Sequence, residues 1–216
     1  MVIQVIKYSL RLEFHLRNSL KIYKLKTRLR NQRYMTSDGF RSNFSQSIPL
    51  ISEAYSLGNT YELSVYNKLP NDMITNVTFY ASAINALAEE DVRVSDRLRL
   101  RSNKLRGFES NKTGPVDNGD YVGGNYASSL NLSTTLPMIF QSLDNADVSY
   151  FVDMANVWGV DYSNSVGDSN HIRSSTGVLI NWFTPIGPLN FSFSQPISKV
   201  DTDKTQSFQF NLGTTF

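Results

Sequence analysis

The sequence has no cysteine and only two histidines among its 216 residues. Without cysteine there can be no disulfide, no thiolate-bound metal and no thiol nucleophile. His15 and His171 lie far apart in the sequence, and neither belongs to a metal-binding or catalytic spacing. We therefore expect a protein that is not an enzyme and that carries no metal and no cofactor.

Long hydrophobic runs are also missing. No stretch of about 18 apolar residues occurs, which excludes a transmembrane helix. A transmembrane β-barrel stays possible, because its strands alternate apolar and polar residues and never form a continuous apolar run. No apolar core of roughly 7–15 residues follows the N-terminus, so we expect the chain to lack a cleavable export signal.

Charge is distributed unevenly along the chain. Residues 1–33 hold nine of the 21 Lys and Arg but only one of the 19 acidic residues, Glu13, which gives this segment a local charge of +8 and the remainder −6. Such a basic stretch could contact nucleic acid or a membrane surface. Apolar and polar residues alternate from Tyr8 to Arg17, but the pattern degrades after Leu20. For residues 1–34 we therefore expect one strand or non-native sequence.

From Met35 onward the alternation becomes regular. Eight runs of about 10–13 residues each place apolar or aromatic side chains opposite Ser, Asn and Thr, as in residues 126–136 and 148–155. Globular strands average about 5–6 residues, whereas strands that cross a membrane in a barrel need about 9–11. The run length favours a membrane barrel; a soluble β-sandwich is the alternative.

The connections between these runs alternate in kind. Those near residues 70–72, 137–145 and 184–188 are short or contain proline, while those at 87–124 and 159–170 are long and polar. Short turns at one rim and long loops at the other are typical of outer-membrane barrels. The predicted fold is therefore all-β, an antiparallel transmembrane β-barrel portion of about eight strands.

The long loop at 87–124 contains a basic run, and its default interpretation is a solvated surface. The run comprises Arg97, Arg99, Arg101, Lys104 and Arg106. The glycine-rich segment 119–124 has no helix after it, so it does not form a phosphate-binding loop. Asp201 and Asp203 are expected at a hairpin tip and not as a catalytic carboxylate pair.

Arg106 is the exception in this loop. Its guanidinium is always charged and offers five donors in a rigid fork. If the loop folds back into the barrel, Arg106 needs an acceptor on the inner face of a strand. The alternation places Asp153 and Asn131 on that face, so we expect a charge-assisted bond that pins the loop.

Several motifs of the chain occur in the order found in one family of outer-membrane barrels. They are Leu105–Asn111, Gly114-Pro115, Gly123–Asn125, Phe151–Trp158, Ile172–Gly177, Pro185–Pro196 and the ending Phe208–Phe216. From about residue 35 the chain resembles the C-terminal half of the barrel of the BamA, or bacterial surface antigen, family. Residues 1–33 show no visible match.

This resemblance implies a sixteen-stranded outer-membrane barrel that follows periplasmic POTRA domains and inserts other β-barrel proteins into the bacterial outer membrane. It implies that 35–216 form the second half of that barrel and that 87–124 is its sixth extracellular loop. Arg106, Gly107 and Phe108 would form a loop lock, with Asp153 as one partner and Asn131 as a weaker, neutral one. The terminal run would be the family's C-terminal β-signal, formed by Phe208, Phe210, Leu212, Gly213 and Phe216.

The implied partners are nascent outer-membrane β-barrel proteins, the lipid bilayer with its lipopolysaccharide, and accessory assembly lipoproteins, with no nucleic acid. A half-barrel with a free edge near residue 40 cannot close, and open edges are not tolerated in lipid. The sequence thus also predicts a fragment, truncated or frame-shifted upstream of about residue 33. Alternative functions are a two-partner secretion or TamA-like translocation barrel, and a passive porin-like channel.

Overall fold

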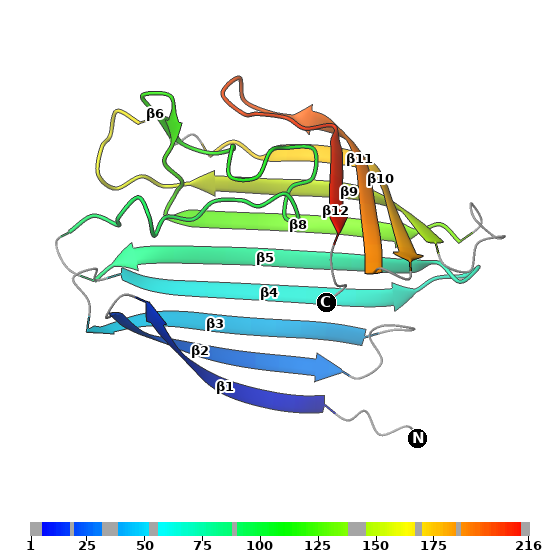
Figure 1. Ribbon diagram of the computed structural model, residues 1–216, viewed down its shortest axis with the longest axis horizontal. Coiled ribbons are helices and arrows are strands. Elements are labelled where there is room, and N and C mark those ends of the chain that lie inside the picture. The colour runs from blue at the N-terminus through cyan, green and yellow to red at the C-terminus, as the bar shows by residue number, and fades with distance from the viewer. Residues whose placement is uncertain are drawn as a thin grey trace.

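The computed structural model describes residues 6–17, 20–31, 39–51, 56–87, 90–137, 146–166, 170–184 and 187–212, with residues 6–31 described by their backbone alone. One antiparallel sheet of ten strands dominates the fold (Figure 1). Its strands, in spatial and sequence order, are β1 (Ile6–Arg17), β2 (Leu20–Asn31), β3 (Gly39–Ile51), β4 (Ser56–Lys68), β5 (Ile74–Ala86), β8 (Tyr126–Thr135), β9 (Ala146–Trp158), β10 (Arg173–Thr184), β11 (Gly187–Ser198) and β12 (Phe208–Leu212). The short hairpin of β6 (Val116–Asp117) and β7 (Asp120–Tyr121) lies within the long loop 87–124.

The predicted all-β antiparallel fold is confirmed. After residue 35 the main sheet contains eight strands, and the seven from β3 to β11 are 10–13 residues long. Strand β12 has five residues within the described part of the chain, and these pair with residues 189–193 of β11. Within the described ranges, no helix is long and apolar enough to cross a membrane.

The N-terminal segment forms two strands where the sequence indicated at most one. β1 and β2 pair along their whole length, and β2 pairs with β3, so the sheet continues through residues 6–31. The reason is visible in β2, where Leu25, Thr27 and Leu29 alternate with Lys and Arg. Basic residues at every second position keep the period of two that a strand requires.

The two faces of the sheet differ in polarity, as the alternation predicts. One face carries exposed apolar rings such as Phe44, Phe79, Tyr150 and Trp182, each 37–47% exposed. Cross-strand pairing brings such rings together; the Phe193 and Phe208 ring centroids, for example, are 5.0 Å apart. The opposite, inner face carries small polar side chains, buried examples being Ser64, Ser82, Ser129, Asp153, Ser175 and Ser192.

The long loop packs against this polar inner face, where Figure 1 draws it in green across β8 and β9. Leu100, Leu105 and Phe108 from the loop form a buried cluster with small side chains of the sheet, namely Ala127, Ala155 and Val157. The hydrophobic core therefore lies between a loop and the sheet and not between two sheets. This packing holds the tip of the loop over the middle of β9.

Candidate functional site

Arg106, at the tip of the loop, is paired with Asp153 of β9. Its Nε donates to Asp153 Oδ2 at 2.7 Å and its Nη2 to Oδ1 at 2.7 Å, while the Arg106 backbone N–H also reaches Oδ2 at 3.0 Å. Asp153 has no exposed surface. A two-pronged guanidinium–carboxylate pair is the strongest kind of side-chain hydrogen bonding. The guanidinium thus neutralises a fully buried charge, and the backbone amide supplies a third hydrogen bond to the same carboxylate.

Neighbouring residues hold the guanidinium and the loop backbone in place. The Phe151 ring lies against Arg106, with 3.7 Å between the ring centroid and Cζ, within cation–π range. The Ser175 hydroxyl donates to the Arg106 carbonyl. Ser175 on β10 is the register partner of Asp153 on β9, so adjacent strands contact both the side chain and the backbone of Arg106.

The backbone conformation and the limited space at the tip of the loop both favour glycine at position 107. Its φ is 87°, and a Cβ added there would lie 3.3 Å from the Cβ atoms of both Ser175 and Ser194. Phe108 follows and is 1% exposed, with its ring in the buried cluster and its carbonyl accepting a bond from Gln209 Nε2 at 2.9 Å. The structure therefore brings Arg106, Gly107 and Phe108 together with Asp153.

Asn131 faces inward as the alternation predicts, but it contacts a different part of the loop. Its Nδ2 donates to the Lys104 carbonyl at 2.9 Å, and its Oδ1 accepts from the Ser129 hydroxyl at 3.2 Å. The sequence-based expectation was that it would accept a bond from Arg106. A carboxamide both donates and accepts, and here its donor end serves the loop backbone two residues before Arg106.

The basic run is a solvated surface only in part: Arg101 is exposed, but other members of the run are paired with carboxylates. Arg97 is 4% exposed and forms an ion pair with Asp161, and Lys104 forms one with Glu62. Lys104 Nζ also lies 4.6 Å from the centroid of the Tyr80 ring. The acidic partners lie on β4 and in the 159–172 connection, too distant in sequence for a charge pattern to reveal them.

A second buried ion pair, which sequence reasoning missed, joins Arg173 and Asp203. Arg173 Nε lies 2.9 Å from both Asp203 oxygens, and Nη1 donates to Asn156 Oδ1 at 2.7 Å. Asp203 does lie between β11 and β12, as the hairpin-tip interpretation requires, but its carboxylate is buried. The available signal was the position of Arg173, which shares the inward parity of Ser175.

The terminal strand presents its aromatic residues outward. Phe208, Phe210 and Leu212 are 47–62% exposed on the apolar face, while Gln209 between them is 6% exposed and faces the loop. Gly213 and Phe216, also predicted for this signal, lie outside the described residues. The predicted residues thus divide between two places, the loop lock on the inner face and an apolar stripe on the outer one.

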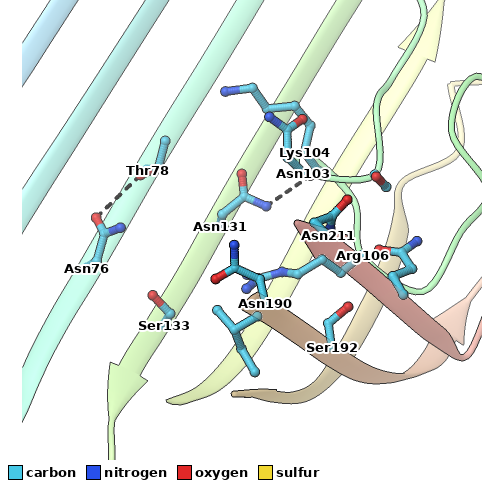
Figure 2. A pocket seen from close by; sticks show the side chains of 13 residues that line it. Asn76, Thr78, Asn103, Lys104, Arg106, Asn131, Ser133, Asn190, Ser192 and Asn211 are labelled. Atoms are coloured by element: carbon cyan, nitrogen blue, oxygen red, sulfur yellow. Dashed lines mark hydrogen bonds between the residues drawn. The ribbon is translucent and has the colours of Figure 1, made fainter. Parts of the chain in front are cut away.

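A polar cavity of about 310 Å³ adjoins the lock. Figure 2 shows Asn131, Asn190 and Asn211 around Arg106, with Ser192 nearby, so carboxamides and hydroxyls from four strands line it. Lys104 and Arg106, the two cations at its wall, each have a carboxylate partner. Across the described part of the chain, no group of three or more His, Asp or Glu could hold a metal ion. Both cations at the cavity wall therefore contribute to the contacts that hold the loop against the sheet.

Away from the sheet, Asp161 has a pKa below its ordinary value of 3.8. Partial burial raises this pKa, but hydrogen bonds from the Val92 amide and the Asn125 side chain, together with the charge of Arg97, outweigh it. The outer part of the long loop is therefore held by a carboxylate that prefers to stay ionised.

A twisted antiparallel sheet, apolar outside and polar inside, with a long loop ion-paired to its inner face, defines a portion of an outer-membrane-type β-barrel. Residues 7–216 match the model of the Omp85 superfamily domain, and the chain belongs to that family. The match includes β1 and β2, so most of the basic segment that showed no visible resemblance lies within the family domain.

Curated proteins similar to this chain support the same family assignment. The chain is 30% identical to the outer membrane protein assembly factor BamA of Neisseria meningitidis over 139 residues, 52% of this chain and 17% of that protein. It is 27% identical to the human sorting and assembly machinery component 50 homolog over 121 residues, 52% of this chain and 25% of that protein. The chain thus matches about a fifth of the length of these curated relatives.

A solved structure shares the fold. The crystal structure of BamA from Haemophilus ducreyi lacking POTRA domains 1–3 aligns with a TM-score of 0.78 and 26% identity, covering 91% of this chain and 43% of that one. The sheet described here therefore corresponds to part of a BamA barrel.

Proposed function

We propose that this chain forms the C-terminal part of a barrel that folds and inserts β-barrel proteins into the bacterial outer membrane. The observation that carries the proposal is the buried Arg106–Asp153 pair, which fixes the long loop against the inner face in an Omp85 chain. Relatives from bacteria and from human are named as assembly factors or assembly machinery, which supports the same role here. Residues 35–216 would supply the second half of the barrel, with β1 and β2 continuing its sheet.

The proposed mechanism uses the edge of the sheet and needs no covalent step. Among the described strands, β12 is the last in the sheet order, so one side of its backbone has no strand partner there and could pair with another strand. An incoming strand of a nascent barrel protein would add to this edge by β-augmentation. The loop lock would hold the inner face rigid while the edge exchanges partners.

The apolar side chains on the outer face of the sheet indicate the environment in which the barrel lies. Exposed Phe, Tyr and Trp side chains are compatible with hydrocarbon and with membrane interfaces. We propose the bacterial outer membrane as the location, with its lipopolysaccharide in contact with the outer face. Accessory assembly lipoproteins would be further partners.

The test is Arg106→Ala in a cell that depends on this protein. Removing one partner leaves the Asp153 carboxylate buried and unpaired, which costs about 3–5 kcal/mol, so the loop should leave the inner face and assembly should fail. The measurement is the steady-state amount of several outer-membrane barrel proteins after depletion of the wild-type copy. Arg101→Ala is the matched control, because this arginine belongs to the same loop and is exposed. Unchanged barrel-protein levels in Arg106→Ala cells would contradict the proposal.

A further inference from the structure

We infer that Gln209 and the Arg173–Asp203 pair are positioning residues that tie the tip of the long loop to the terminal strand, so that the two move as one body. The structural coupling stands on contacts alone. Its importance for assembly rests on the function proposed above. The residues concerned lie outside the Arg106–Asp153 lock.

The chain between β11 and β12 departs from the regular hairpin path. The described residues of β12 pair with residues 189–193 of β11, although β11 continues to Ser198. The connecting segment, residues 199–207, instead pairs with the loop tip through an antiparallel bridge between Phe108 and Thr205. In Figure 1 this segment is the orange stretch between the end of β11 and the red β12.

Backbone hydrogen bonds surround that bridge on both sides. The Gln206 amide donates to the Gly107 carbonyl at 2.9 Å, and the Glu109 amide donates to the Lys204 carbonyl at 2.9 Å. A further bond runs from the Lys204 amide to the Lys112 carbonyl at 3.1 Å. Residues 204–206 and the loop tip thus form a short ladder. The end of the connecting segment stays attached to β11, because the Ser194 amide donates to the Ser207 carbonyl at 2.8 Å.

Gln209 carries this connection into the terminal strand itself. Its side chain faces inward between Phe208 and Phe210, is almost completely buried, and donates from Nε2 to the Phe108 carbonyl at 2.9 Å. This carbonyl lies two residues after Arg106. If the glutamine left, the buried carbonyl would lose its side-chain donor, and an unpaired buried acceptor is costly.

Arg173 fixes the start of the same segment. Both oxygens of Asp203 lie 2.9 Å from Arg173 Nε, and Asp203 Oδ2 also accepts the Val200 amide at 2.7 Å. The connecting segment is therefore held at β10, at the loop tip and at β12. A displacement of β12 must either break this ladder or move the loop tip and strain the Arg106–Asp153 pair.

The first experiment measures hydrogen exchange in the purified full chain in lipid nanodiscs. In Gln209→Ala, exchange at the Glu109 and Gln206 amides should rise about fivefold, the factor expected for the loss of one ordinary hydrogen bond. Gln209→Met should behave in the same way, because methionine has an unbranched side chain of similar length but no hydrogen-bond donor. Gln195→Ala, at an exposed position of β11, is the control. Unchanged exchange at Glu109 in both Gln209 variants would overturn the inference.

The second experiment uses the absence of cysteine. Glu109→Cys combined with Lys204→Cys creates a single thiol pair at two positions that lie directly opposite each other in this ladder. If loop tip and strand move together, the oxidised double variant should assemble barrel proteins as well as its reduced form, and it should restore assembly to Gln209→Ala. Loss of assembly on oxidation, reversed by reductant, would overturn the inference.

The experiments distinguish a failure of the structural coupling from a failure of the proposed function. If Arg106→Ala and Gln209→Ala both leave assembly unchanged while exchange at Glu109 rises, the coupling stands and the proposed function fails. If Arg106→Ala abolishes assembly but Gln209→Ala changes neither assembly nor exchange, the positioning role fails.

Discussion

Two independent constraints, the backbone conformation and the space available for a side chain, act on the glycine at the tip of the long loop. At Gly107 the backbone has a positive φ, and two serine side chains of neighbouring strands approach from the sheet. At Gly119, in the β6–β7 turn, φ is almost the same at 88°, but nothing lies within 4 Å of an added Cβ. Substituting each glycine in turn therefore distinguishes the cost of backbone strain from the cost of steric crowding.

Gly107→Ala should destabilise the folded barrel by roughly 1–3 kcal/mol from its strained backbone, with an added cost because Ser175 and Ser194 must shift. Gly119→Ala should show the backbone cost alone. The measurement is denaturant unfolding in detergent, followed by heat-modifiable gel mobility. Equal losses in the two variants would mean that close contact at Gly107 contributes nothing.

The contacts of single residues also show which parts of the site could be predicted from the sequence. Asp153 was found because strand alternation places it inward, and alternation is a local property. The donor role of Asn131 was not, because it depends on which loop carbonyl comes within reach. Asp203 is similar: its pairing with Arg173 follows from the path of residues 199–207, and no local pattern encodes that path.

At the scale of elements, the strands were predictable and their partners in the loops were not. β3 to β11 follow runs with a period of two, so their faces could be assigned from sequence. β2 was harder to assign because its alternating residues are Lys and Arg and not Ser or Asn. The ion pairs of the loop join residues more than forty positions apart, beyond the range of any periodicity.

The outer part of the long loop should respond to acid. The folded-state pKa of Asp161 lies below its ordinary value of 3.8, so its stabilisation is fully present above that value and is lost as pH falls through the folded-state pKa. Acidification below 3.8 should release the Arg97 segment first. Pepsin cleavage within residues 87–124, measured across this range in nanodiscs, reports the release.

Asp161→Asn serves as the comparison for the acid response. It keeps the shape of the side chain but removes the ionisable group, so cleavage should already be raised at neutral pH and should change less on acidification. An identical pH profile in the two proteins would assign the response to another carboxylate.

For the whole molecule, the polarity of the two faces determines where a charge can be tolerated. Phe79→Arg places a guanidinium on the apolar face near the middle of β5 and should cost roughly 2–4 kcal/mol if that face meets hydrocarbon. Asn76→Arg, on the inner face of the same strand and lining the polar cavity, is the matched control. The measurement is the fraction that folds into lipid vesicles, read from heat-modifiable mobility. Equal folding of both variants would argue against a lipid-facing outer surface.

The alternation in β12 has a consequence for any rearrangement at that edge. Phe208 and Phe210 point outward, and Gln209 between them points inward. Sliding the strand by one residue would turn the glutamine toward lipid and a phenylalanine toward the Phe108 carbonyl. Register changes at this edge are therefore restricted to even numbers of residues, with a smallest stride of about 6.8 Å. An incoming strand with the same alternation would be subject to the same parity rule.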